Sequence, residues 1–192
     1  MLNVEQHGIG VFREFRTPDA TFDVCWSEAK QSQLLSASGD GCLRLWDTLG
    51  QAQEPLVQVK AHEAEIQGID WNHINKRTIL SASQDCKIKV WDAETLQTGQ
   101  PSGVFSHDFT VYAATWHPTH ESIFGSCSGD QTARIWDLRS GKDVKRIHGH
   151  SNEILAMDFN KYENFIATAS TDNAVKVWDL RATTDQPIMV LL

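Results

Sequence analysis

The sequence predicts an all-β protein in which one structural unit occurs four times. Two observations carry this prediction. Four segments align without a gap, and in each a short polar turn separates two apolar runs. All seven tryptophans also occupy one of two repeating positions. The aligned segments are LLSASGDGCLRLWD (34–47), ILSASQDCKIKVWD (79–92), FGSCSGDQTARIWD (124–137) and IATASTDNAVKVWD (166–179).

The period of the repeat is 42 to 45 residues. An aspartate in the polar turn recurs at intervals of 45, 45 and 42 residues, and a tryptophan six residues later repeats these intervals. A second aromatic series lies ahead of both, at intervals of 45, 45 and 43 residues. The three series are Asp40, Asp85, Asp130 and Asp172; Trp46, Trp91, Trp136 and Trp178; and Trp26, Trp71, Trp116 and Phe159.

The local pattern inside each unit is typical of strands. Runs such as LRLW and KIKVW alternate apolar with polar residues, which predicts strands with one buried face. The segments SGDG, SQDC, SGDQ and STDN between the runs predict hairpin turns, because Asp, Gly and Asn tolerate the backbone angles of a tight reversal. No segment has a convincing helical period. We therefore expect a single all-β domain without an internal linker.

Composition and charge narrow the function classes. Seventeen basic against 25 acidic residues give a formal charge of −8, which opposes binding to nucleic acid or to an anionic membrane surface. The longest apolar run, Ile188 to Leu192, is too short for membrane insertion, and the first residues do not read as a signal peptide. The four cysteines form no CxxC pair, so we expect free thiols in a reducing, cytosolic compartment.

The recurring Trp-Asp pairs, each with a turn aspartate six residues before the tryptophan, resemble the WD40 repeat of β-propellers. This resemblance implies one incomplete propeller domain over residues 1–192, with about four of the seven blades that are usual in the family, since seven need about 300 residues. Leu2 to Glu5 then resembles the last strand of a preceding blade, and the chain looks truncated. The expected units are 9–47, 56–92, 103–137 and 144–179, with 186–192 as the start of a further blade.

The WD40 resemblance also implies a buried network in each blade, from strand Trp to strand Ser or Thr to loop His to turn Asp. The family histidine stands about 29 residues before the strand tryptophan, and three units have it. The first unit has Thr17 there, so we expect an incomplete network in that blade. The implied sets are Trp91, Ser81, His62 and Asp85; Trp136, Ser126, His107 and Asp130; and Trp178, Thr168, His150 and Asp172.

Catalytic, metal and nucleotide interpretations fit the residues less well. A Ser, His and Asp set suggests a hydrolase triad, but the set recurs in three units and no G-x-S-x-G is present. His117, His120 and the pair His148 and His150 suggest a metal, yet no Cys or carboxylate stands at a ligand-like spacing. Phosphate-loop motifs are absent. We expect no enzyme activity, no metal and no cofactor.

A propeller acts as a binding platform, and the WD40 resemblance implies which residues face the ligand. These are the positions three and five residues after the loop histidine and the one before the turn aspartate. They carry two carboxylates, an aromatic ring and a leucine, which suit an amphipathic helix with a basic residue and an apolar stripe. The alternative is that Glu65 and Glu153 are solvated surface charges. The expected top-face residues are Ala20, Phe22 and Gly39; Glu65, Gln67 and Gln84; Thr110, Tyr112 and Gly129; and Glu153, Leu155 and Thr171.

A narrower resemblance points to one family of propellers. FDVCWSE (22–28), EILAMDFNKYEN (153–164) and WDLR followed by QPI (178–188) are similar to receptors for the type 2 peroxisomal targeting signal. The resemblance implies a receptor of the cytoplasm and peroxisome that binds the basic amphipathic signal of cargo proteins, with a co-receptor and docking proteins as further partners. NFIATASTDNAVKVWDLR also resembles histone-binding propellers, so a histone-binding or other WD40 scaffold stays open as an alternative.

Overall fold

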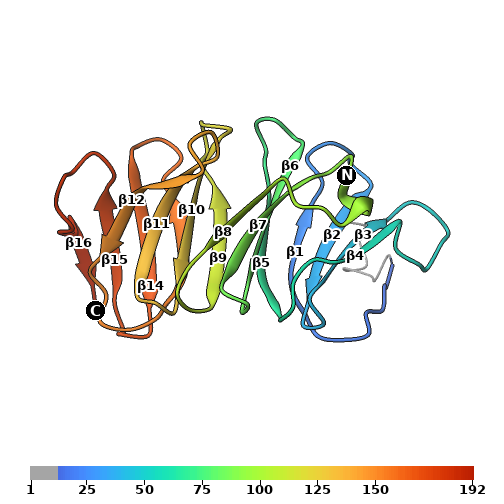
Figure 1. The fold of residues 1–192 in the computed structure, drawn as a ribbon, viewed down its shortest axis with the longest axis horizontal. Helices are drawn as coiled ribbons and strands as arrows, with labels where there is room; N and C mark the ends of the chain where they lie inside the picture. Colours follow the sequence, from blue (N-terminus) through green and yellow to red (C-terminus); the bar gives the residue numbers. More distant parts are fainter. Residues whose placement is uncertain (1–12) are drawn as a thin grey trace, which may run out of the picture.

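The computed structural model describes residues 13–192, which form four antiparallel sheets of four strands each (Figure 1). One short 3-10 helix, η1 (Leu96–Thr98), lies between the second and third units of the chain. The strands, sheet by sheet, are β1 (Thr21–Trp26), β2 (Gln33–Ser38), β3 (Cys42–Asp47) and β4 (Val57–Lys60); β5 (Ile66–Trp71), β6 (Thr78–Ser83), β7 (Lys87–Asp92) and β8 (Gly103–Ser106); β9 (Val111–Trp116), β10 (Ile123–Ser128), β11 (Thr132–Asp137) and β12 (Lys142–His148); and β13 (Ile154–Phe159), β14 (Phe165–Ser170), β15 (Val175–Asp179) and β16 (Met189–Leu191).

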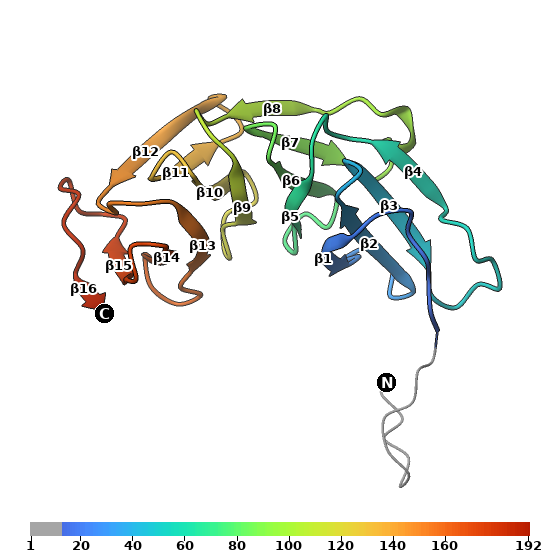
Figure 2. The same ribbon diagram turned by 90° about the horizontal axis from the view of Figure 1, so that it is seen from below.

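The four sheets stand side by side in an arc. Within each sheet the strands follow the order of the chain, so every sheet is a simple meander. Strands β1, β5, β9 and β13 line the concave side of the arc, and β4, β8 and β12 lie on its convex side (Figure 2). This arrangement confirms the predicted fold class, an all-β partial propeller.

The turn between the second and third strands has the same backbone conformation in every sheet. The residue after the turn aspartate has a positive φ of 67° to 71° in all four copies. Only glycine adopts this left-handed conformation without strain, and asparagine tolerates it better than most residues. The four residues are Gly41, Cys86, Gln131 and Asn173.

The hydrophobic core lies between neighbouring sheets. In the first of three clusters, Ile69 and Trp71 of the second sheet pack with Leu35 and Leu45 of the first. The next cluster joins the second sheet to the third, and the last joins the third to the fourth. Because each buried Leu or Ile contributes roughly 1.5 to 3 kcal/mol, contacts between sheets are a main source of stability.

The sheets are out of phase with the sequence units. Each sheet combines three strands of one unit with the first strand of the next. This corrects the expectation for 186–192, because Met189 to Leu191 pair with β15 and form the outer strand of the fourth sheet rather than part of a further blade. An edge of β15 is available for this pairing, whereas the sequence pattern alone does not indicate a partner. The expected strand Leu2 to Glu5 lies outside the described residues.

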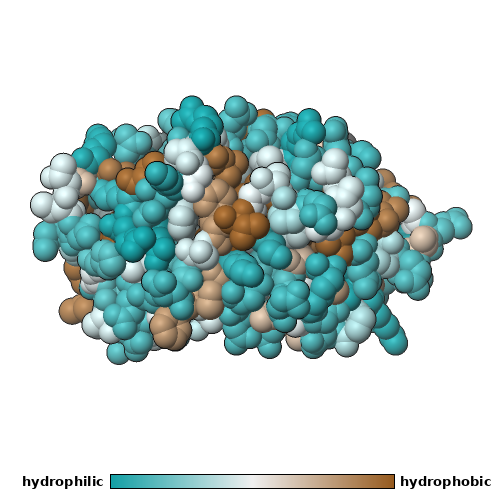
Figure 3. Space-filling model, viewed as in Figure 1, coloured by the Kyte–Doolittle hydropathy of each residue, from teal (hydrophilic) through white to brown (hydrophobic). Residues whose placement is uncertain are grey.

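The convex side of the molecule is mostly hydrophilic, with apolar patches near its middle where β8 runs (Figure 3). Val104 on β8 is 53% exposed and contributes to this surface.

All four cysteines are free thiols, and burial raises the pKa of Cys127 to about 12. Within residues 13–192, the structure contains no helix with the length and apolar character that a membrane crossing needs.

Candidate functional site

A chain of four polar side chains fixes the loop before the inner strand of the second sheet. The indole N–H of Trp91 donates to Ser81 Oγ at 2.8 Å, and Ser81 Oγ lies 2.7 Å from His62 Nε2. On the other side of the ring, His62 Nδ1 lies 2.9 Å from Asp85 Oδ2. With Nδ1 protonated, His62 donates to the carboxylate and accepts from the serine hydroxyl, so every buried group is paired.

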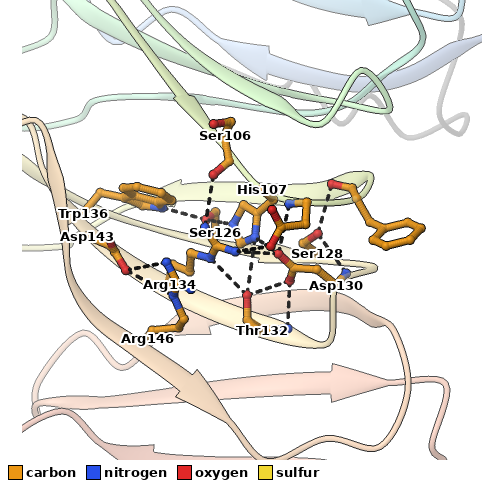
Figure 4. A network of polar contacts seen from close by, with 12 residues as sticks. Ser106, His107, Ser126, Ser128, Asp130, Thr132, Arg134, Trp136, Asp143 and Arg146 are labelled. Carbon is orange, nitrogen blue, oxygen red and sulfur yellow. Dashed lines mark hydrogen bonds and ion pairs between the residues drawn. The ribbon is translucent and has the colours of Figure 1, made fainter.

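The third and fourth sheets repeat this geometry. His107 Nδ1 lies 2.8 Å from Asp130 Oδ2, and its Nε2 lies 2.7 Å from Ser126 Oγ. Figure 4 shows Asp130 between His107 and Thr132, with Trp136 bonded to Ser126. In the fourth sheet, His150 Nδ1 lies 2.9 Å from Asp172 Oδ2, and His150 Nε2 lies 2.7 Å from Thr168 Oγ1. The indole N–H of Trp178 donates to the same Thr168 Oγ1 at 2.8 Å.

The networks change the pKa values of their members. Burial lowers the pKa of His62 and His107 below the usual range, although the bonded carboxylates oppose this shift. Burial raises the pKa of Asp85, but the hydrogen bond from His62 and two backbone N–H groups outweigh it and lower the pKa to about 2. These directions favour a neutral imidazole beside an ionised carboxylate.

The geometry of the Ser, His and Asp sets fits a structural role rather than a catalytic one. Ser81 and Ser126 are fully buried, and each hydroxyl oxygen already accepts an indole N–H. A nucleophilic serine needs an accessible oxygen, so this geometry does not suit acyl transfer. Among residues 13–192, no three His, Cys, Asp or Glu side chains are grouped as metal ligands.

The first sheet holds its turn aspartate in a different way. Arg44 is 1% exposed and its guanidinium bonds both oxygens of Asp40 and Ser38 Oγ. The hydrogen bond from Arg44 is the main cause of the lowered pKa of Asp40. Thr17, at the place of the histidine, instead bonds the carbonyl of Asp19 at 2.7 Å. Trp46 still donates to Ser36 Oγ at 2.8 Å.

A basic residue four positions after each turn aspartate belongs to these networks, and sequence reasoning missed it. Arg134 donates to Asp130 Oδ2 at 2.7 Å and to Thr132 Oγ1 at 3.1 Å. Lysines at the same position reach backbone carbonyls of the loop that carries the histidine. The repeated spacing of a basic residue between two apolar ones was visible in the sequence. The four residues are Arg44, Lys89, Arg134 and Lys176.

The expected top-face positions are tied together in pairs. In every sheet, the N–H of the residue before the turn aspartate donates to the carbonyl of the residue three places after the loop histidine or its substitute. The distances are 2.8 to 3.0 Å, and each bond joins the residue before the first strand of a sheet to the turn between its second and third strands. The pairs are Gly39 with Ala20, Gln84 with Glu65, Gly129 with Thr110, and Thr171 with Glu153.

Side-chain contacts divide this face into separate groups. Tyr112 OH donates to Glu153 Oε2 at 3.0 Å, which joins the third sheet to the fourth. Burial raises the pKa of the Tyr112 hydroxyl, and the hydrogen bond to the Glu153 carboxylate and its negative charge raise it further. In the second sheet, Gln67 Nε2 donates to Glu65 Oε2 at 3.1 Å. The structure therefore brings Tyr112 and Glu153 together and gives Glu65 a different partner.

Exposed apolar side chains occur at the expected top-face positions and next to one of them. Phe22 is 46% exposed and Leu155 is 44% exposed. Phe109, which was not among the expected residues, is 63% exposed, and its Cβ lies close to the place that a side chain on Gly129 would occupy. The signal in the sequence was a phenylalanine two residues after a loop histidine, inside the otherwise polar segment HDFT (107–110). The face thus combines acidic and apolar groups.

Several curated proteins are similar to part of the chain. The peroxisomal targeting signal 2 receptor of Mus musculus is 41% identical over 70 residues, which are 36% of this chain and 22% of that protein. The Saccharomyces cerevisiae receptor of the same name is 39% identical over 67 residues, 34% of this chain and 18% of that protein. Peroxisome biogenesis protein 7 of Arabidopsis thaliana is 40% identical over 57 residues, which are 29% of this chain and 18% of that protein. The matched part spans about a fifth of each relative.

The family model described as "WD domain, G-beta repeat" matches most of the chain. It covers residues 13–47, 53–92, 99–137 and 141–179. Each match ends on the Trp-Asp pair of one repeat, and each repeat contributes three strands to one sheet. The chain therefore belongs to the WD40 repeat family.

Proposed function

We propose that this chain acts in peroxisomal protein import by binding the N-terminal type 2 targeting signal of cargo proteins on its top face. The observation that carries the proposal is the similarity to relatives named as receptors for this signal in mammals and fungi. The WD40 fold and these relatives point to a binding protein rather than an enzyme.

The chemistry of the top face supports the proposal. Glu65 and Glu153 accept hydrogen bonds from the neutral side chains of Gln67 and Tyr112, and their negative charge suits a basic side chain of a ligand. Phe22, Phe109 and Leu155 present exposed apolar surface. An amphipathic helix with a basic residue and an apolar stripe matches such a surface. A receptor of this kind works in the cytoplasm and at the peroxisome, together with a co-receptor and docking proteins.

The test is a binding titration with a labelled synthetic peptide that carries a type 2 signal. Fluorescence anisotropy of the peptide with the 192-residue chain should show saturable binding. The double variant Glu65→Lys and Glu153→Lys should lose at least about a hundredfold in affinity, since each charge-assisted hydrogen bond is worth roughly 1.5 to 3 kcal/mol. Glu163→Lys, an exposed substitution in the loop after β13, is the matched control and should bind like the wild type.

Two further arms distinguish this function from the other candidates. The milder variant Glu65→Gln with Glu153→Gln keeps the shape of the face and should bind more weakly than the wild type. A labelled histone-tail peptide, which is basic but not amphipathic, should bind weakly. Unchanged affinity in both double variants would remove these glutamates from the site, and tight histone binding would favour the histone-binding alternative.

A further inference from the structure

The arc has an open sheet face at each end (Figure 2). On the first sheet, Val24 and Trp26 of β1 are 53% and 58% exposed. On the fourth sheet, Val175 of β15 is 37% exposed, and Met189 and Leu191 of β16 are 54% and 55% exposed. The pairing of Val175 with Leu191 and of 177 with 189 puts these apolar residues on one side of the sheet.

The contacts inside the arc show what the face of the first sheet is built to meet. Ile69 and Trp71 take the places of Val24 and Trp26 one repeat later, and they are only 7% and 4% exposed. They are buried because they pack against the preceding sheet. The same places in the third and fourth sheets are also buried against the sheet before them. These residues are Ala114 and Trp116, and Met157 and Phe159.

The open face of the fourth sheet is the other half of the same contact. Val177 takes the place of Leu45, Val90 and Ile135, which are buried under the sheet that follows each of them. Val177 is only half-buried. The two ends of the arc therefore carry the two complementary halves of an interface that occurs three times within the chain.

A polar contact between the second and third sheets has matching groups at the two ends of the arc. The backbone N–H of Trp116 donates to Asp70 Oδ2 at 2.7 Å, which joins the second sheet to the third. Asp158 takes the place of Asp70 on the fourth sheet, and Trp26 takes the place of Trp116 on the first. A fourth sheet seated on a first sheet would bring the exposed Asp158 carboxylate to the N–H of Trp26.

One contact competes with such an arrangement. The ring of Phe15 packs on Trp46 with centroids 4.9 Å apart, as Phe105 of β8 packs on Trp136 at 5.3 Å. Phe105 lies on an outer strand, and Leu191 of β16 lies at the matching place on the fourth sheet. An incoming fourth sheet would bring Leu191 against Trp46, so Phe15 has to leave that position.

We propose that two copies of this chain join head to tail through these faces, the fourth sheet of each on the first sheet of the other, with Phe15 as an internal competitor. Two contacts related by a twofold axis close a ring and leave no open face. The ring has eight sheets, which lies within the range of four to eight blades that propellers adopt. This inference does not rest on the proposed function.

Sedimentation equilibrium of the 192-residue chain tests the association. The wild type should have twice the monomer mass of 21.6 kDa at about 100 µM. Val24→Glu and Val175→Glu each place a carboxylate in the interface and should weaken the dimer at least about a hundredfold. Leu49→Glu, at a loop residue that is 73% exposed, is the control and should dimerise like the wild type.

Two further measurements make the proposal specific. A mixture of the Val24→Glu and Val175→Glu chains has one intact interface, so it should form a dimer that neither variant forms alone. Phe15→Ala removes the competitor and should tighten the dimer about tenfold. A monomeric wild type at about 100 µM, masses that grow beyond a dimer, no association in the mixture, or an unchanged Phe15→Ala affinity would each overturn the proposal.

Discussion

The guanidinium of Arg44 holds the carboxylate of Asp40 in the first sheet, where a loop histidine performs this task in the other three. Arg44 is almost completely buried, and it also bonds Gln58 Oε1 at 3.2 Å on the outer strand β4. One side chain thus connects the turn, the third strand and the fourth strand of this sheet. The Asp40 turn in turn supports Ala20 and Gly39 of the top face.

Replacement of Arg44 should therefore destabilise the protein. Arg44→Met keeps most of the apolar volume but leaves the Asp40 carboxylate without its cation, which should cost roughly 2 to 4 kcal/mol of unfolding free energy. Urea unfolding followed by tryptophan fluorescence measures this change. Arg77→Met removes an exposed ion pair with Asp92 and should change stability little. Equal effects of the two substitutions would contradict the role assigned to Arg44.

The shared hydroxyl in the second sheet leads to a second prediction. Ser81→Ala removes the partner of both Trp91 Nε1 and His62 Nε2, so two buried polar groups lose a hydrogen bond. We expect a loss of about 2 to 4 kcal/mol. Ser36→Ala in the first sheet deprives only Trp46 of its acceptor and should cost about 1 to 2 kcal/mol. The comparison uses thermal and urea unfolding, and a larger loss for Ser36→Ala would contradict the network.

The buried histidines predict how stability depends on pH. Burial lowers the folded-state pKa of His62 and His107, whereas an unfolded histidine titrates near 6.5. Below about pH 6.5 the unfolded chain therefore binds more protons than the folded chain, and stability falls with falling pH.

We expect the unfolding free energy to be about 1 to 2 kcal/mol lower at pH 5.5 than at pH 7.5. Urea titrations at both pH values measure this difference. His107→Asn removes one of the two groups and should reduce the difference. A profile that is flat from pH 7.5 to 5.5 would show that the imidazoles are not held neutral.

The repeat predicted an all-β fold, because spacing along the chain is what a repeat displays, and the WD40 resemblance implied the residues that lie together in the networks of the second, third and fourth sheets. The positions of Glu65 and Gln84, or of Glu153 and Thr171, follow from the same resemblance, which counts them from the loop histidine and the turn aspartate. The replacement of histidine by Arg44 does not. A pattern shows that Thr17 differs from a histidine, but it does not show which other side chain reaches the aspartate.

Contacts between sheets were also beyond the sequence pattern. The alternation of apolar residues indicates that a strand has a buried face, but it does not indicate which neighbouring sheet covers that face. The bond from Trp116 to Asp70 and the pairing of Tyr112 with Glu153 depend on the arrangement of sheets in space. The pairing of Met189 to Leu191 with β15 has the same origin.

The repeated turn conformation predicts that one substitution destabilises the protein and that another stabilises it. Gly41 has a φ of 71°, and a Cβ there would collide with the carbonyl oxygen of His62 and lie 2.9 Å from that of Ala64. Gly41→Ala should cost at least about 2 kcal/mol. Gln131 has a φ of 67° with a side chain in place, so Gln131→Gly should relieve strain and stabilise by up to about 1 kcal/mol. Thermal unfolding measures both changes in stability. A Gln131→Gly variant that is less stable than the wild type would show that Gln131 is not strained.

Asp70 is the clearest test of how the sheets hold each other. Its Oδ2 accepts the backbone N–H of Trp116 at 2.7 Å and the hydroxyl of Thr115 at 3.0 Å, and burial raises its pKa. Asp70→Ala leaves a buried N–H without an acceptor between the second and third sheets, so we expect a loss of about 2 to 3 kcal/mol in urea unfolding.

Two matched variants separate the acceptor from the charge at this position. Asp70→Asn keeps an acceptor oxygen of similar size and should cost less than Asp70→Ala, because burial already disfavours the charged carboxylate. Thr115→Val removes only the hydroxyl donor and should cost about 1 kcal/mol. If Asp70→Asn were as damaging as Asp70→Ala, the negative charge rather than the hydrogen bond to Trp116 would be what joins these sheets.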